Sequence, residues 1–219
     1  MSASAAKRDY SFLLRKLHSL TGIVPVGAYL VDHLWSNSYS LVGEMNYNVQ
    51  SRDLQTVPWR LPLEIAIIWA PIAYHAFYGF YIWSRGKSNV SAYPWVGNRM
   101  FTLQRWTGLL AFLFIAWHLY DERFATHGMS TYTDVYNSMQ NVWFFIFYLV
   151  GVTACCVHFG VGIWNFLCKW GLAATKSSQR AAGWLGVAVA AVLVIMSLTI
   201  IISFRYGWHP LNGYISQSQ

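Results

Sequence analysis

Charged side chains are scarce in this sequence of 219 residues, which has only 8 acidic residues and a charged fraction of 11%. Average proteins carry about a quarter of their residues as charged types. Hydrophobic residues make up 56% and aromatic residues 18% of the chain. A water-soluble fold with so few charges could not cover its own surface. The composition therefore excludes an ordinary soluble protein and predicts a chain covered by lipid.

Cysteine is also rare, and its spacing gives it no chemical role. The three cysteines, Cys155, Cys156 and Cys168, lie in or beside one apolar segment, without a CxxC pair or a CxxCH haem-attachment motif. We expect them to be buried hydrophobic side chains, and any haem to be bound non-covalently. A signal peptide is not expected, because residues 1–10 are polar and the apolar stretch after them is too long for one.

Long apolar windows account for most of the chain. A transmembrane helix needs about 20 mainly apolar residues to cross the bilayer core. Five windows meet this requirement, at about residues 17–35, 61–83, 101–120, 142–167 and 182–204. Short polar connections join them, and no internal repeat is present. The sequence predicts an all-α integral membrane protein, a single domain over residues 1–219 with five transmembrane helices.

The basic residues predict the orientation, since Lys and Arg accumulate in cytoplasmic loops. Eleven of the fifteen lie at the N-terminal end or in connections on the same side of the membrane, and the other four are Arg52, Arg60, Arg123 and Arg205. The N-terminus is therefore expected to be cytoplasmic and the C-terminus outside. The net charge of +7 mostly reflects the inner face. It favours a protein partner or anionic lipid at that face over nucleic acid.

Four of the seven histidines lie well inside predicted spans, one in each of the first four: His33, His75, His118 and His158. A single intramembrane histidine is often explained by an interhelical hydrogen bond. Four of them, one per helix, favour a function, since ionisable residues in spans usually face the protein interior.

The depths of these histidines sort them into two pairs. His33 and His118 come about 16 and 17 residues into spans that run outward, while His75 and His158 come about 14 and 16 residues into spans that run inward. We call His33 and His118 the outer pair and His75 and His158 the inner pair. The two levels are expected to differ by on the order of 10 to 15 Å.

Two imidazoles on neighbouring helices are what a six-coordinate, electron-transferring haem requires. The pattern predicts two haem b groups within a core of four helices, with the four histidines as axial ligands of the iron. Glycines near the ligands, such as Gly108 and Gly151, would give a flat macrocycle room, although glycines also serve helix packing. A zinc site is disfavoured because each pair lacks further ligands.

Other functions remain open at this level. A haem-free transporter could use the histidines as a proton relay. A retinal protein is poorly supported, because no lysine lies within a span to form the Schiff base.

Several motifs together resemble the cytochrome b subunit of succinate:menaquinone oxidoreductases, especially the five-helix, di-haem type of Gram-positive bacteria. The chain is also similar to the anchors of di-haem fumarate reductases. The resemblance covers nearly the whole chain, from about Tyr10 to the end of the fifth span. Its motifs are residues 15–22 (RKLHSLTG), 25–27 (PVG), 63–65 (LEI), 74–79 (YHAFYG), 103–108 (LQRWTG), 117–118 (WH), 158–159 (HF) and 162–164 (GIW).

The resemblance implies a role as the membrane anchor of succinate dehydrogenase, or respiratory complex II, in the bacterial cytoplasmic membrane. The partners would be a flavoprotein with FAD and an iron–sulfur protein on the cytoplasmic face. Electrons would pass through both haems to menaquinone, linking the tricarboxylic acid cycle to electron transport. This chain has no binding motif for FAD or an iron–sulfur cluster, so it is expected to be an electron-transfer subunit without independent catalytic activity. Alternatives are a fumarate reductase anchor and a cytochrome b of another complex, such as hydrogenase or formate dehydrogenase.

The resemblance also singles out Glu64, since a glutamate at the corresponding place in related fumarate reductases handles quinol protons. A carboxyl near the quinone ring suits proton transfer, although Glu64 could instead face water or pair with Arg60. The fifth span departs from similar fumarate reductases, because residues 182–204 contain no acidic residue. This difference favours succinate oxidation.

At the inner ends of the first and third spans, Arg15, His18, Ser19 and Arg105 are candidates for binding the propionates of the inner haem. Arginine pairs well with carboxylates. Cytoplasmic anchoring or contact with the iron–sulfur subunit would explain these residues equally well. His127 and His209 lie in polar outer segments and are expected at the surface.

Overall fold

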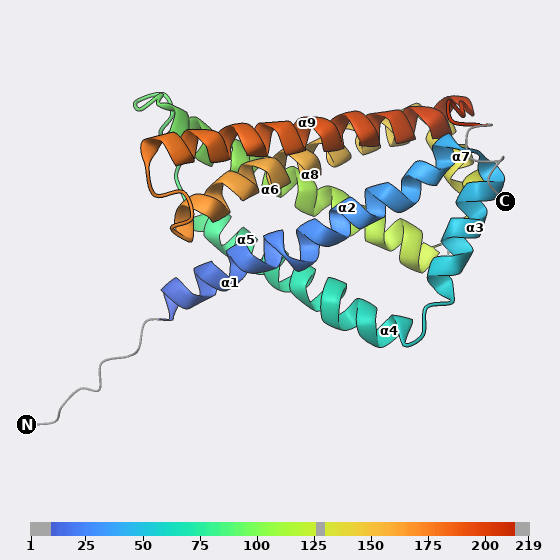
Figure 1. The fold of residues 1–219 in the computed structure, drawn as a ribbon, viewed down its shortest axis with the longest axis horizontal. Helices are drawn as coiled ribbons and strands as arrows, with labels where there is room; N and C mark the ends of the chain where they lie inside the picture. The colour runs from blue at the N-terminus through green and yellow to red at the C-terminus, as the bar shows by residue number, and fades with distance from the viewer. Residues whose placement is uncertain (1–9, 126–129, 213–219) are drawn as a thin grey trace, which may run out of the picture.

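The computed structural model describes residues 10–125 and 130–212, and all of the regular secondary structure within these ranges is helical. Within them, four helices are long and apolar enough to cross a membrane, and they match the second to fifth predicted spans: Arg60–Arg85, Val96–Ala125, Val142–Lys169 and Lys176–Tyr206. Figure 1 shows the long helices lying along the length of the molecule. The chain is thus a multi-pass membrane protein. Lys7 and Arg8, two of the eleven basic residues assigned to the cytoplasmic side, and His127 lie outside the described residues.

The first predicted span is two helices instead of one. Helix α1 (Ser11–Ile23) and helix α2 (Pro25–Asn37) are 13 residues each and follow one another in nearly the same direction (Figure 1). Pro25 has no N–H to donate to the carbonyl of Thr21, although Val24 before it keeps helical angles of φ −78° and ψ −66°. The helix therefore breaks at Val24. Neither half alone has the roughly 20 residues needed to span a bilayer.

Helices α8 (Val142–Lys169) and α9 (Lys176–Tyr206) form the closest helix pair. A Cβ atom added to Gly160 would overlap the carbonyl of Gly186, and the reverse also holds. Small residues allow such backbone contact in membranes, where packing rather than the hydrophobic effect holds helices together. The capping box of Thr175 and Ser178 begins α9, and Gly207 ends it with a φ of 61°.

The second and third spans each contain a π-helical turn. In the second, α4 (Arg60–Leu63) leads through η2 (Glu64–Trp69) into α5 (Ala70–Arg85). In the third, α6 (Val96–Leu119) continues as η3 (Tyr120–Ala125). π-Helical turns are rare and occur frequently at functional sites.

Two polar helices that the sequence analysis did not predict cover one end of the molecule. These are α3 (Glu44–Gln55) and α7 (Tyr132–Gln140), which lie beside the C-terminal end of α9 (Figure 1). Helix α7 starts at a capping box formed by Thr131 and Asp134. The Tyr132 side chain is buried against Phe204 of α9, with ring centres 5.0 Å apart. We refer to α3 and α7, with the short 3-10 helix η1 (Ser38–Leu41), as the outer cap.

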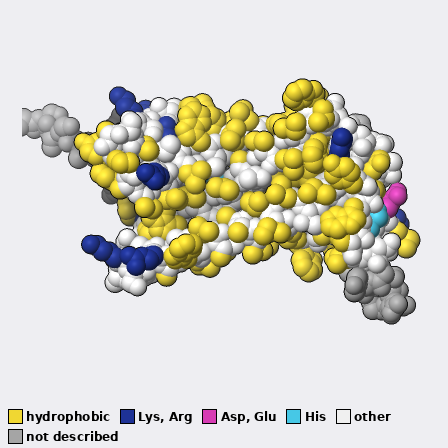
Figure 2. All heavy atoms as spheres, turned by 90° about the horizontal axis from the view of Figure 1, so that it is seen from above, with side chains coloured by type: hydrophobic (Ala, Val, Ile, Leu, Met, Phe, Trp, Pro, Cys, Tyr) yellow, Lys and Arg dark blue, Asp and Glu magenta, His cyan; other side chains and the backbone are white. Residues whose placement is uncertain are grey.

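Hydrophobic side chains dominate the surface of the long helices, as expected for a surface that contacts lipid. Trp184 and Ile195 on α9 are both about two-thirds exposed, at 69% and 66%. Figure 2 shows hydrophobic side chains over the middle of one face, with Lys and Arg side chains mostly at one end. The composition therefore predicted the lipid-facing surface correctly.

Candidate functional site

The structure brings the four intramembrane histidines together in the two pairs that their depths predict. In the outer pair, His33 on α2 and His118 on α6 have ring centres 5.7 Å apart, with an angle of 67° between the rings. In the inner pair, His75 on α5 and His158 on α8 have ring centres 6.2 Å apart, with an angle of 80°. Four different helices thus supply two facing imidazole pairs.

The spacing within each pair fits a metal held between two imidazoles. Metal–imidazole bonds are about 2 Å long, so an ion bound between two rings requires ring centres about 6 Å apart. Both pairs meet this requirement. Among the residues that the structure describes, no group of three or more His, Cys, Asp or Glu side chains could hold a metal ion. The paired geometry therefore fits haem iron, in which the macrocycle supplies the other four ligands.

In the inner pair, hydrogen bonds determine which nitrogen of each ring carries the proton and which could bind a metal. The Nδ1 atom of His75 lies 2.9 Å from the carbonyl oxygen of His18, and that of His158 lies 3.1 Å from the carbonyl oxygen of Gln104. A carbonyl only accepts hydrogen bonds, so Nδ1 carries the proton in both rings. Nε2 then keeps its lone pair, as a metal ligand must, although in His158 the side-chain amide of Gln104 lies 3.3 Å from this atom and would have to give way to a metal. A metal-ligating histidine usually donates its other N–H in this way.

Glycines lie directly against both rings of the inner pair. A Cβ atom added to Gly22 of α1 would overlap the His75 ring, and one added to Gly108 of α6 would come within 2.8 Å of the Cε1 atom of His158. The sequence analysis singled out Gly108 but not Gly22. Gly22 precedes His75 by 53 residues, so only the packing of α1 against α5 reveals this contact.

A fifth histidine lies beside the inner pair. The His18 ring stacks on the His75 ring with centres 4.2 Å apart and an angle of 18°. Its Nδ1 atom is buried and has no hydrogen-bond partner among the described residues. His18 therefore has an unpaired polar atom next to the inner pair.

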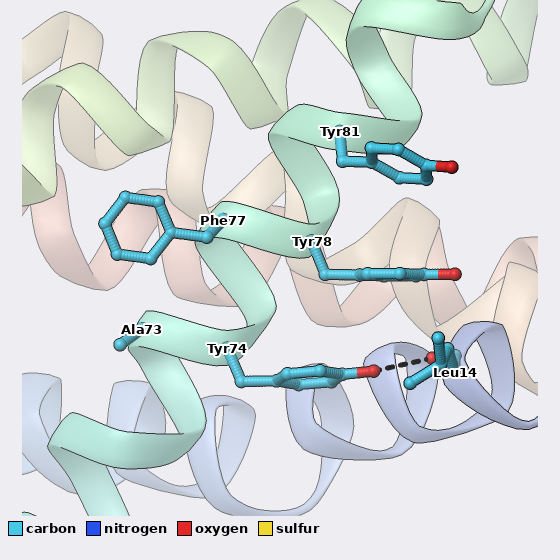
Figure 3. A pocket seen from close by; sticks show the side chains of 6 residues that line it. All are labelled: Leu14, Ala73, Tyr74, Phe77, Tyr78 and Tyr81. Carbon is cyan, nitrogen blue, oxygen red and sulfur yellow. Dashed lines mark hydrogen bonds between the residues drawn. The ribbon is translucent and has the colours of Figure 1, made fainter.

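A groove of about 530 Å³ beside this histidine is lined by α1 and α5 (Figure 3). The phenol rings of Tyr74, Tyr78 and Tyr81 form a stacked ladder with their hydroxyl groups on one side, while Phe77 points away. The Tyr74 hydroxyl donates a 2.9 Å hydrogen bond to the Leu14 carbonyl. This bond joins the first half of α1 to α5. It therefore helps to hold α1, which carries His18, against α5, which carries His75.

The residues expected at the inner end differ in their surroundings. Arg15 is exposed and Ser19 is half-buried, and neither lies in a defined site. Arg105 has a buried guanidinium nitrogen, Nη1, without a hydrogen-bond partner among the described residues. Its guanidinium lies over the rings of Trp83 and Phe101, at 5.6 and 5.3 Å. Arg105 is therefore the residue of this group that most needs an anionic partner.

At the opposite end, Glu64 lies between two arginines. Its Oε1 atom accepts a 2.6 Å bond from Nε of Arg60, and its Oε2 atom accepts a 2.9 Å bond from Nη2 of Arg123. The Glu64 side chain is 18% exposed. The Arg60 pair was one of the two interpretations from sequence, whereas the Arg123 pair was not anticipated. The second ion pair connects the π-helical turns η2 and η3, and η3 continues the helix of His118.

His209, which was expected at the surface, is only part-exposed. Its ring is half-buried, with Nδ1 2.8 Å from the carbonyl oxygen of Ser40, and its centre lies 5.4 Å from that of Tyr132 in the outer cap. His209 therefore attaches the segment after α9 to the outer cap. It takes part in neither histidine pair.

Comparison with known proteins adds an independent line of evidence. Residues 87–196 match the family model described as succinate dehydrogenase/fumarate reductase transmembrane subunit. The chain is also 35% identical over 195 residues to the succinate dehydrogenase cytochrome b558 subunit of Bacillus subtilis (strain 168), an alignment that covers 88% of this chain and 96% of that protein. The chain belongs to the family of succinate dehydrogenase/fumarate reductase transmembrane subunits.

Proposed function

We propose that this chain is the di-haem b anchor of a succinate dehydrogenase, and that it passes electrons from an iron–sulfur subunit to menaquinone. The observation that carries this proposal is the pair of facing imidazole sites, with ring centres 5.7 and 6.2 Å apart. The relative from Bacillus subtilis is a cytochrome b558 subunit by name, which agrees with a haem-binding role for this chain.

In this proposal, His33 and His118 are the axial ligands of an outer haem, and His75 and His158 are those of an inner haem. Bis-histidine haem supplies reversible one-electron transfer without an open position for oxygen. The protein's part is to hold each imidazole in place. The carbonyls of His18 and Gln104 do this for the inner pair, because they accept hydrogen bonds from the Nδ1–H groups of the ligands.

Arg105 is proposed to bind a propionate of the inner haem. It lies on α6 one turn before Gly108, which contacts the ring of the inner ligand His158. A buried guanidinium nitrogen without a partner costs free energy unless an acceptor reaches it. A propionate carboxylate would satisfy it through a charge-assisted hydrogen bond. Arg15 and Ser19 are weaker candidates for the same role.

Menaquinone is proposed to react near Glu64, at the outer end of the second span. Quinone reduction consumes two electrons and two protons, so the site needs a group that can carry a proton to a quinone oxygen. The carboxylate of Glu64 would take a proton from the outer aqueous side and pass it on. Arg60 and Arg123 hold this carboxylate in one position through both of its oxygens. Arg123 also connects the carboxylate to the helix that carries His118.

The membrane arrangement is proposed to have five crossings, with α1 and α2 together forming the first and the N-terminus in the cytoplasm. The two helices comprise 26 residues, 13 in each, which is enough for one crossing. The basic cytoplasmic face would bind the iron–sulfur and flavoprotein subunits. FAD and the iron–sulfur clusters would belong to those partners, in the cytoplasmic membrane of a bacterium.

A fumarate reductase anchor, which would run the electrons in reverse, is the second candidate, since the family description names both enzymes. The composition of α9 favours succinate oxidation. Its 31 residues include no Asp or Glu that could return protons across the membrane beside the haems.

Single-ligand variants test the haem assignment. His118→Ala should remove the outer haem and His158→Ala the inner haem, so that each variant binds about one haem b per chain. His209→Ala is the matched control and should retain the wild-type amount, because His209 belongs to neither pair. Haem is quantified in the purified complex by its pyridine haemochrome spectrum. Wild-type haem content in either ligand variant would contradict the assignment.

A further inference from the structure

The two histidine pairs differ in what their Nδ1 atoms contact. Both ligands of the inner pair bond to backbone carbonyls. In the outer pair, the Nδ1 atom of His118 lies 3.0 Å from the hydroxyl oxygen of Tyr148 on α8. Tyr148 is only 7% exposed, so water does not compete for this contact. A tyrosine side chain therefore contacts Nδ1 of His118, whereas Nδ1 of each inner ligand bonds to a backbone carbonyl, with the Thr107 hydroxyl also 3.4 Å from Nδ1 of His158.

Tyr148 continues this contact to a carboxylate. Its hydroxyl donates to Oε1 of Glu122 at 3.4 Å, and the hydroxyl of Ser130 donates to the other carboxylate oxygen. Glu122 lies in η3, the π-helical continuation of the helix that carries His118. The three side chains form a chain from imidazole through phenol to carboxylate.

The carboxylate determines the direction of these hydrogen bonds. The Tyr148 hydroxyl donates its single proton to Oε1 of Glu122, so that proton is not available to His118. The phenol oxygen must then accept from His118, which requires the proton of that ring to sit on Nδ1. This leaves the Nε2 lone pair free for iron. The Glu122 carboxyl group at the far end of the chain accepts the phenol proton, which makes the imidazole a stronger electron donor.

Aromatic packing keeps the imidazole in this orientation. The ring of Phe114 lies parallel to that of His118, at 5.5 Å and 7°, and edge-on to that of Tyr148, at 5.2 Å and 88°. A Cβ atom added to Gly151 would overlap Phe114, so this glycine gives the ring its place. The hydrogen bond and the packing thus fix the same ring from two directions.

We propose that Tyr148 is a positioning residue for His118 and that Tyr148 and Glu122 together lower the midpoint potential of the outer haem. The inference rests on the proposed haem ligands and goes beyond them, because it assigns a role to two residues that do not touch the iron. Electron donation from the hydrogen-bonded imidazole stabilises the ferric state relative to the ferrous state. Axial ligands and their hydrogen bonds are known determinants of haem potentials.

A redox titration of the purified complex, with separate midpoints for the two haems, tests this proposal. Tyr148→Phe removes the acceptor and should shift the oxidation equilibrium of the outer haem about tenfold toward the reduced form, a rise of about 59 mV for one electron. Glu122→Gln keeps the size of the side chain but replaces the carboxyl group by an amide, and should give a smaller rise. The inner haem should be unchanged in both variants.

The control is Tyr132→Phe, which removes a hydroxyl from another buried tyrosine, in the outer cap. The Tyr132 hydroxyl has no hydrogen-bond partner among the described residues, so both midpoints should keep their wild-type values. As a second readout, the low-spin electron paramagnetic resonance signal of the outer haem should move in Tyr148→Phe and Glu122→Gln only.

The possible results separate this inference from the proposed function. Wild-type protein without low-spin haem would overturn both. Two haems in the wild type, with outer midpoints in Tyr148→Phe and Glu122→Gln that equal the wild-type value or move together with the inner one, would overturn the inference alone. If Tyr148→Phe fails to assemble, the Glu122→Gln midpoint decides.

Discussion

A methyl group added at Gly22 should remove the inner haem and leave the outer haem in place. In the Gly22→Ala variant, the new Cβ atom would overlap Cε1 of His75 and lie 2.8 Å from its Nδ1 atom. Ordinary contacts between such atoms begin near 3.5 Å, so relief of the Nδ1 contact alone would move the imidazole by about 0.7 Å, and the closer Cε1 contact requires more. Metal–ligand distances tolerate about 0.2 Å. The shift is therefore several times larger than the coordination of an inner haem would allow.

The substitution should cost about 1–3 kcal/mol through overpacking, partly offset by the roughly 1 kcal/mol that alanine gains over glycine in a helix. The fold should therefore persist while the inner haem is lost. We expect the haem b content to fall from about two to about one per chain, with the outer haem retained. Quantitative haem analysis of the purified complex, together with the reduced optical spectrum, measures this.

Gly183→Ala on α9 is the matched control. A Cβ atom added there would lie 3.8 Å from Cδ1 of Trp164, which is ordinary contact, and both haems should remain. If Gly22→Ala retains two haems with an unchanged spectrum, the placement of His75 against α1 would be refuted. If Gly183→Ala also loses a haem, general helix sensitivity would explain the result instead.

Three further predictions concern charged groups. Arg105→Gln should lower the midpoint potential of the inner haem, because it removes a positive charge that stabilises the reduced form. Arg52→Gln in the outer cap is the control and should leave this potential unchanged. Redox titration measures both variants. Glu64→Gln should reduce succinate-dependent menaquinone reduction at least tenfold with both haem spectra intact, and an unchanged rate in the assembled complex would remove Glu64 from the quinone site. The backbone N–H and hydroxyl of Thr131 donate to Asp134 and hold the pKa of that carboxyl below its usual value. Its contribution to stability is therefore fully present above about pH 4 and lost as the pH falls through the lowered folded-state pKa, so Asp134→Asn should flatten this part of the pH dependence of thermal unfolding.

The sequence predicted the long helices and the histidine pairs because both depend on distance along the chain. Hydropathy located four spans to within a few residues at most ends, since about 20 apolar residues are needed to cross a bilayer. The rise per residue then gave the relative depths of the four histidines. The same reasoning counted residues 17–35 as one span, although Pro25 divides that segment into two helices.

Hydropathy and spacing along the chain could not predict contacts that depend on the rotation of a helix about its axis. Tyr148 lies ten residues before His158 on the same helix, yet it contacts the other histidine pair. The ion pair between Arg123 and Glu64 joins two separate spans in the same way. The outer cap was missed for another reason, because its helices are short and polar and carry no hydropathy signal.

The measurement that tests the central claim most directly is a dithionite-reduced minus oxidised spectrum of the purified complex, with haem b quantified per copy of this chain. The two imidazole pairs predict about two low-spin haems b per chain. One haem would mean that one pair is structural. The absence of haem from the assembled complex would contradict the account.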